Sequence, residues 1–148
     1  MGDLAHTTPG ELRAAFETAI KAITADHPEH GTRWRVMKQL SEVPGPDVRK
    51  FFIECGRATP VQGGIFCGGC EYKFDMEIWT SYGALASKHD DSIVTHDAQQ
   101  LYQTLANLYA TLSGLTMVEP LGWRDGEGAE SGRLWGAHQF EIHYFADV

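Results

Sequence analysis

The sequence predicts an α+β fold: a small antiparallel sheet with an N-terminal helix and a second amphipathic helix packed on one face. Apolar residues recur at helical spacing near the start of the chain and again after residue 97, whereas the segments between and after them alternate with a period of two. Helices that stand apart from a run of strands are typical of this class. The chain has 148 residues, the usual length of one domain, so residues 1–148 are expected to share a single core.

Composition excludes several classes of protein. Hydrophobic residues make up 43% of the chain and charged residues 22%, which is typical of a globular protein. The formal net charge of -8, with no cluster of Lys and Arg, argues against a surface that grips DNA. No apolar run is long enough to span a membrane, and the first residues have no secretion-signal pattern, so we expect a cytosolic protein. Three cysteines do not indicate a disulfide framework.

The first helix has a clear start. Thr8 is the predicted N-cap, Pro9 takes the first helical position and Glu11 completes a capping box. The helix is expected to run until Pro28, with a loop over residues 27–31. Its apolar face is formed by Leu12, Ala15, Phe16, Ala19, Ile20 and Ile23.

Three strands are expected to follow. The first starts at Thr32, with Trp34 and Val36 on one face, and runs towards a turn at Pro44–Asp47. The second covers residues 48–55, and residues 56–64 form a loop. In the third, over residues 71–79, the apolar face consists of Tyr72, Phe74, Met76 and Ile78. The opposite face carries Glu71, Lys73, Asp75 and Glu77, so it meets either solvent or a polar interface.

The second helix is expected to begin at Asp97 as N-cap, after a polar loop over residues 81–95, and to end at Gly114. Its apolar stripe is formed by Leu101, Leu105, Leu108 and Leu112. Residues 115–121 are extended, and residues 133–145 form the last strand. Between them, residues 122–132 are predicted to be a glycine-rich loop or hairpin tip, with Trp123, Arg124 and Arg133 as candidate contact residues of a protruding arm.

The CGGC sequence at residues 67–70 could carry chemistry or only a turn. Cys67 and Cys70 supply two zinc ligands, and Cys55 with His89 or His96 could add others, but the spacing matches no common zinc motif. A thioredoxin-like site needs a helix after its first cysteine, whereas a strand pattern follows here. We therefore favour a turn at Gly68-Gly69 that leads into a strand.

No other motif indicates catalysis. The seven histidines lack the spacing of a helical metal site and are expected to lie at the surface. The chain contains no nucleophile elbow, phosphate-binding loop or dinucleotide fingerprint. The sequence therefore predicts no enzyme and no catalytic, cofactor-binding or metal-binding residue.

The order of elements resembles a known family. The segment FDMEIWTSYG at residues 74–83, a polar loop, a leucine helix that begins at Asp97 and ends at Gly114-Leu115, a glycine-rich loop and a final HQFEIHY strand at residues 138–144 are similar to tail terminator (tail completion) proteins of long-tailed phages. The resemblance covers nearly the full chain. The CGGC sequence and Cys55 do not belong to that pattern.

The resemblance implies a structural protein of the virion neck, assembled in the host cytoplasm. Such proteins form a ring, usually of six copies, that caps the tail tube, stops its polymerisation and offers a docking surface to the head connector. The tail tube protein and the connector or stopper protein would then be partners, and DNA would pass through the lumen without specific binding. Two alternatives are another neck protein, such as a head completion or stopper protein, and a cytosolic enzyme that uses zinc or thiols of Cys55, Cys67 and Cys70.

Overall fold

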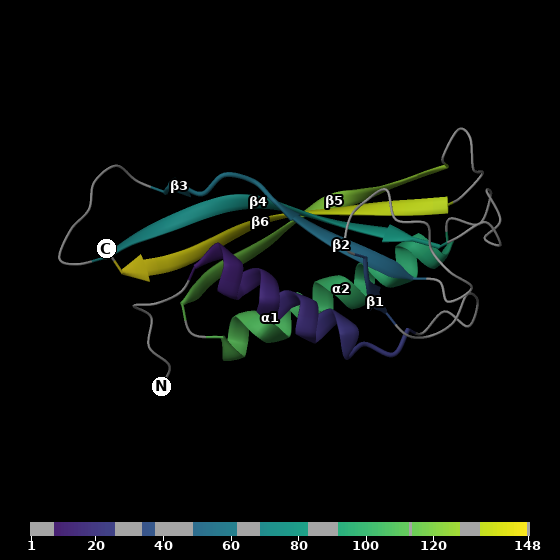
Figure 1. Ribbon diagram of the computed structural model, residues 1–148, viewed down its shortest axis with the longest axis horizontal. Helices are drawn as coiled ribbons and strands as arrows, with labels where there is room; N and C mark the ends of the chain where they lie inside the picture. Colours follow the sequence, from purple (N-terminus) through teal and green to yellow (C-terminus); the bar gives the residue numbers. More distant parts are fainter. Residues whose placement is uncertain are drawn as a thin grey trace.

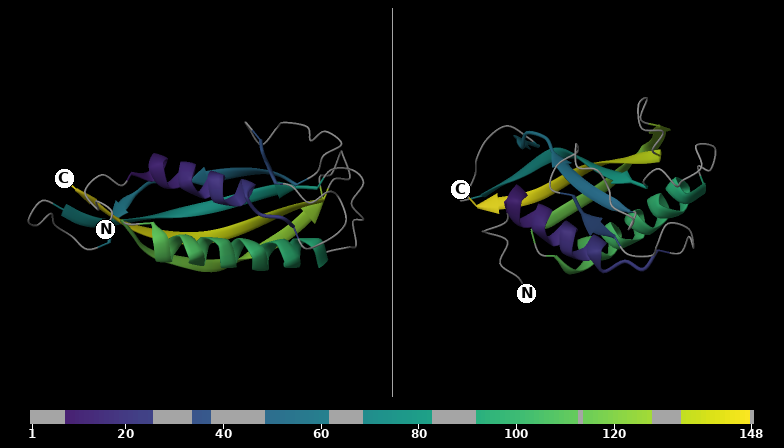
Figure 2. Two further views of the ribbon diagram at one scale, coloured as in Figure 1. Left: turned by 90° about the horizontal axis from the view of Figure 1, so that it is seen from below. Right: turned by 45° about the vertical axis from the view of Figure 1, so that its right-hand side comes forward.

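A computed structural model describes residues 8–25, 34–37, 49–61, 69–82, 92–112, 114–127 and 134–147. Two helices lie on the same face of one six-stranded sheet (Figures 1 and 2), which confirms the α+β prediction. The helices are α1 (Pro9–Lys21) and α2 (Ser92–Thr111). The strands are β1 (Arg35–Val36), β2 (Lys50–Cys55), β3 (Thr59–Pro60), β4 (Gly69–Ser81), β5 (Leu115–Glu127) and β6 (Leu134–Asp147).

The strand order is β1-β2-β4-β6-β5, and β3 pairs with β4 outside this path. The pairs among β2, β4, β6 and β5 are antiparallel, as expected, whereas β1 and β2 run parallel. The three long strands β4, β6 and β5 form the body of the sheet. None of the helices that the structure describes is long and apolar enough to cross a membrane.

The start of α1 is as predicted, but its end is not. The side chain of Thr8 accepts a hydrogen bond from the Glu11 backbone N–H, and Leu12, Phe16 and Ile20 are buried. The helix ends at Lys21, well before Pro28. The amide of Ile23 donates to the carbonyl of Ile20, a tighter bond than the α-helical one, and this bond closes the last turn.

Only a short part of the predicted first strand is present. β1 has two residues, and the residues buried beside it are Trp34 and Met37, whereas Val36 is only half-buried. Val36 lies opposite Phe51 and packs against the same core as Trp34, which agrees with the prediction that these two residues share one face. Trp34 packs edge to face against Phe51 at 6.2 Å, and the Met37 amide donates to the Phe51 carbonyl, so β2 determines the conformation here. The predicted turn at residues 44–47 lies outside the described residues.

The alternation of the long strands is confirmed. Phe74, Met76 and Ile78 of β4 are buried under the helices, and Tyr72 is half-buried. β4 is longer than predicted and pairs with β6 from Gly69↔Asp147 to Ser81↔Trp135. The core combines residues of these strands with the helix residues Leu12, Phe16, Ile20, Leu101 and Leu105.

The second helix begins five residues earlier than predicted. α2 starts at Ser92, so Asp97 is not its N-cap but a fully buried residue inside it. The apolar stripe reaches back to Ile93 and Val94, which are also buried. The Asp97 carboxylate accepts hydrogen bonds from Arg49 and Tyr82 and is therefore engaged in the core.

The glycine at position 122 marks a bulge and not the start of a loop. β5 continues to Glu127, and its register on β6 shifts between Pro120 and Gly122, where Gly122 has φ 119°. Trp123 and Arg124 therefore lie on a paired strand. The short β3 likewise replaces part of the predicted loop over residues 56–64. Gly114, the predicted helix-ending glycine, has φ 89°.

Candidate functional site

The face of the sheet that the helices leave uncovered is the candidate functional site, and we call it the open face. Strand alternation places the side chains that point away from the helices on this face. They come from β2, β4, β5 and β6. The members discussed below are Glu54, Glu71, Lys73, Asp75, Glu77, Trp79, Arg124, Trp135, Gln139, Glu141 and His143.

One end of the open face is an aromatic cluster around an arginine. Trp79 and Trp135 lie 5.2 Å apart between ring centroids. The guanidinium carbon of Arg124 lies 5.2 Å from the Trp79 ring centroid and 5.3 Å from that of Trp135. The same guanidinium approaches Glu77 at 3.9 Å, although the Arg124 side chain is 56% exposed. Both rings thus attract the guanidinium through cation–π interactions, while much of the Arg124 side chain stays exposed.

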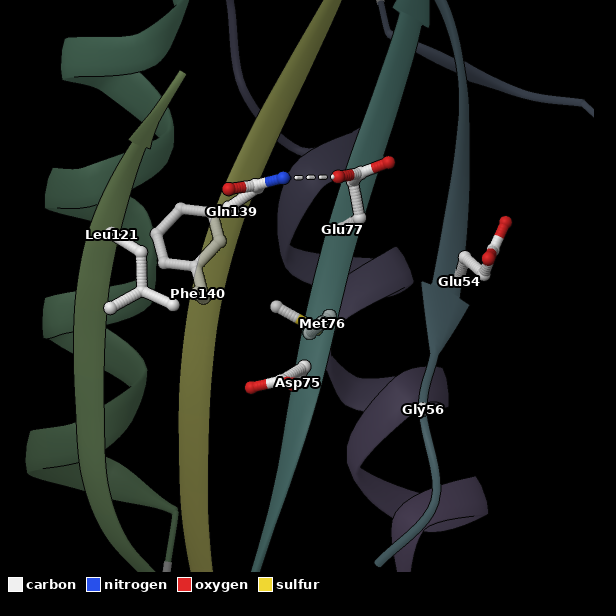
Figure 3. Close-up of a pocket in the computed structure, with 8 residues that line it drawn as sticks. All are labelled: Glu54, Gly56, Asp75, Met76, Glu77, Leu121, Gln139 and Phe140. Carbon is white, nitrogen blue, oxygen red and sulfur yellow. Dashed lines mark hydrogen bonds between the residues drawn. The ribbon is translucent and has the colours of Figure 1, made fainter. Parts of the chain in front are cut away.

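The middle of the open face is a shallow acidic groove of about 310 Å³ (Figure 3). Its polar side chains are Glu54, Asp75, Glu77 and Gln139, and Leu121 stands at its rim. The Gln139 amide donates to Glu77 at 2.7 Å. Glu54 lies opposite Glu77 in the register. Like charges in directly opposed positions are unfavourable in an isolated sheet.

Further carboxylates lie opposite one another on the neighbouring strands β4, β6 and β5. Asp75 is opposite Glu141, and Glu141 is opposite Glu119. His143 lies 2.9 Å from Glu141, and this hydrogen bond lowers the pKa of the Glu141 carboxyl. Thr116 donates to Glu71 at 2.6 Å. The open face is therefore an acidic surface on which several side chains are hydrogen-bonded to one another.

The structure brings together some of the predicted contact residues and separates others. Glu71, Lys73, Asp75 and Glu77 lie on one face of β4, as predicted, and Arg124 joins them through Glu77. Trp123 does not, because it points to the helix side, where its ring meets Tyr102 of α2 at 6.1 Å. Arg133 lies outside the described residues. The predicted loop over residues 122–132 is wrong for Trp123 and Arg124, since both are part of β5.

The cysteine hypotheses are only partly covered by the described residues. Cys55 is a half-buried free thiol on the helix side of the sheet, and burial raises the pKa of this thiol. A raised pKa disfavours the reactive thiolate. Cys67 lies outside the described residues, whereas the backbone of Gly69 and Cys70 begins β4, as the interpretation of CGGC as a lead-in to a strand requires. Within the described residues, no group of three or more His, Cys, Asp or Glu side chains could hold a metal ion.

A buried polar cluster was not predicted. Arg49 Nε donates to Asp97 Oδ2 at 3.0 Å, and the Tyr82 hydroxyl donates to the same oxygen at 2.7 Å. All three residues are fully buried. Burial raises the pKa of Tyr82, and the neighbouring Asp97 raises it further. The cluster ties the start of β2, the end of β4 and α2 together, so its role is structural.

His138 contradicts the expectation that the histidines lie at the surface. Its side chain is fully buried on the helix side of β6, and neither ring nitrogen has a hydrogen-bond partner among the described residues. Burial lowers the pKa of His138 to about 4, so the ring is neutral near pH 7. The alternation of β6 was the available signal, because His138 is two residues before Phe140 and therefore shares its buried face.

Comparison with known proteins adds no identification. No protein-family model matches the chain, and no curated protein matches it either.

Proposed function

We propose that this protein is a non-enzymatic virion assembly protein, a tail terminator whose ring caps the tail tube and joins it to the head connector. The observation that carries the proposal is the open face, a broad sheet surface with acidic and aromatic side chains that neither of the described helices covers. A terminator needs such a surface, because each copy must contact tube, connector and neighbouring copies at once.

The charge of the open face supports this role. Its carboxylates lie opposite one another across β2, β4, β6 and β5. A partner with basic side chains would relieve this repulsion, so electrostatics would guide docking. Together with the formal net charge of -8, the same acids would let DNA pass along the ring without sticking to it.

Tails assembled with and without the protein provide the test. In a lysate of the phage or prophage that carries the gene, deletion should yield tubes of uncontrolled length, and antibody labelling of the complemented lysate should mark one end of each tail. Labelling of heads alone would instead identify a head completion or stopper protein. Normal tails after deletion, with no protein on any particle, would refute the proposal.

A pair of substitutions tests the open face itself. Asp75 is exposed in the acidic groove, and Asp75→Lys should abolish tail capping because it reverses the charge that the partner meets. Ala14→Lys is the matched control, since Ala14 is exposed on α1, on the other side of the sheet. Equal capping by both variants would show that the open face makes no contact.

A further inference from the structure

A second surface, on the side of α2 and β5, differs sharply from the open face because it carries no charge. From Ala98 to Val118 the sequence contains no Asp, Glu, Lys, Arg or His. This segment includes most of α2 and the start of β5. The exposed side of a helix normally carries charged residues, which keep it soluble. We call this surface the α2–β5 face and define it by Gln103, Ala106, Tyr109, Val118 and Trp123.

Exposed apolar side chains gather at the α2–β5 face. Among the described residues, the large hydrophobic side chains classed as exposed are Tyr109 at 52%, Leu121 at 52% and Trp123 at 43%. Tyr109 lies on α2 and Trp123 on β5, and Leu121 stands at the rim that this face shares with the open face. A depression of about 260 Å³ between the helix and the strand is lined by Ala106, Tyr109 and Met117, with Thr116 and Val118. Protein interfaces are enriched in Tyr, Trp and Met and depleted of charge in their centres.

The size of this face fits a weak, transient contact. The uncharged part of α2, residues 98–111, is about 21 Å long, and with the adjacent strand the face is about 20 Å across. The resulting area of about 400 Å² on each partner, or about 800 Å² in total, is that of a weak interface.

We propose that the α2–β5 face binds the same face of a second copy of this chain, so that the free protein is a two-fold dimer. Charge decides this choice of partner. Two copies that each carry a formal charge of -8 repel each other at most orientations, and the α2–β5 face is where they can meet without bringing carboxylates together. A basic partner would instead be attracted to the open face. If the α2–β5 face docked onto a charged surface, the charges of that surface would be buried without partners. The uncharged α2–β5 face of a second copy is therefore the better match.

The dimer goes beyond the proposed tail function. A two-fold contact closes after two copies and cannot by itself build a ring. Any larger assembly therefore needs another contact, and the open face stays exposed in the dimer for that purpose.

Analytical ultracentrifugation of the purified full chain tests the inference. We expect a dimer at tens to hundreds of micromolar protein that persists at about 1 M NaCl, where charges are screened beyond about 3 Å. Tyr109→Glu should weaken the dimer about tenfold or more, because a buried aromatic contact is replaced by a pair of carboxylates. Gln103→Glu, which adds charge at nearly constant shape, should also weaken it.

Ala14→Glu on α1 is the control and should leave the dimer unchanged, since Ala14 is exposed away from this face. Circular dichroism verifies that each variant is folded. A monomer at hundreds of micromolar would overturn the inference, as would an oligomer that dissolves in salt or that Tyr109→Glu leaves intact. The tail experiments are independent of these results, because they locate the protein on particles and do not measure the free state.

Discussion

The buried His138 makes the stability of this protein depend on pH. In the folded chain its pKa is about 4, whereas the ordinary value in an unfolded chain is 6.5. The folded state therefore binds this proton less readily than the unfolded state. The stability that depends on a neutral His138 is fully present above about pH 6.5. It is lost as the pH falls towards about 4.

The magnitude follows from the two pKa values. Their difference corresponds to about 3 kcal/mol of unfolding free energy, a large part of the stability of a domain of this size. The cost arises because the protonated ring would be fully buried, with no hydrogen-bond partner for either nitrogen among the described residues. Carboxylates also titrate in this range. The contribution of His138 to the pH dependence of stability must therefore be separated from theirs.

His138→Leu provides this separation, because leucine has a similar volume and does not titrate. Urea unfolding followed by far-ultraviolet circular dichroism should be measured for both proteins from about pH 7 down to about pH 4. We expect the variant to gain about 3 kcal/mol relative to the parent protein across this interval. Parallel curves for the two proteins, differing by less than about 1 kcal/mol in their pH dependence, would refute the burial argument.

Three further substitutions test the fold by urea unfolding near neutral pH. Asp97→Ala removes the carboxylate that Arg49 and Tyr82 share and should cost about 3–5 kcal/mol, whereas a loss below about 1 kcal/mol would contradict the role of the cluster. Thr8→Ala removes the α1 cap and should cost about 1 kcal/mol, and an unchanged midpoint would show that the cap is not needed. Gly136→Ala should cost about 1–3 kcal/mol, because its β-carbon would lie 3.0 Å from Val94 Cγ1 and 3.3 Å from His138 Nε2; a stabilised variant would mean that these neighbours move aside.

Local patterns were sufficient for the elements whose stability is local. Thr8, Pro9 and Glu11 are adjacent in sequence, and they predict the start of α1 correctly because capping involves only the first turn. The alternation in β4 predicts its two faces for the same reason. The alternation correctly places four of the seven candidate contact residues on one face of β4, namely Glu71, Lys73, Asp75 and Glu77.

Contacts between distant residues explain the errors. An aspartate before a leucine stripe resembles an N-cap, but Asp97 is held by Arg49, which is 48 residues away. The two bulges in β5 shift the alternation, so Trp123 and Arg124 could not be assigned to faces without the register on β6. The cluster of Arg124 with Trp79 and Trp135 combines three strands and leaves no local signal.

We expect the distribution of charge to give the open face and the α2–β5 face different physical tasks. On the open face, carboxylates in opposed positions favour a basic partner, and such contacts weaken as salt rises. On the α2–β5 face, apolar contact is nearly independent of salt. The proposed dimer and the proposed docking of the open face therefore use contacts that respond differently to salt. Salt should therefore separate them: high ionic strength should release the partner of the open face while the pairing through Tyr109 remains.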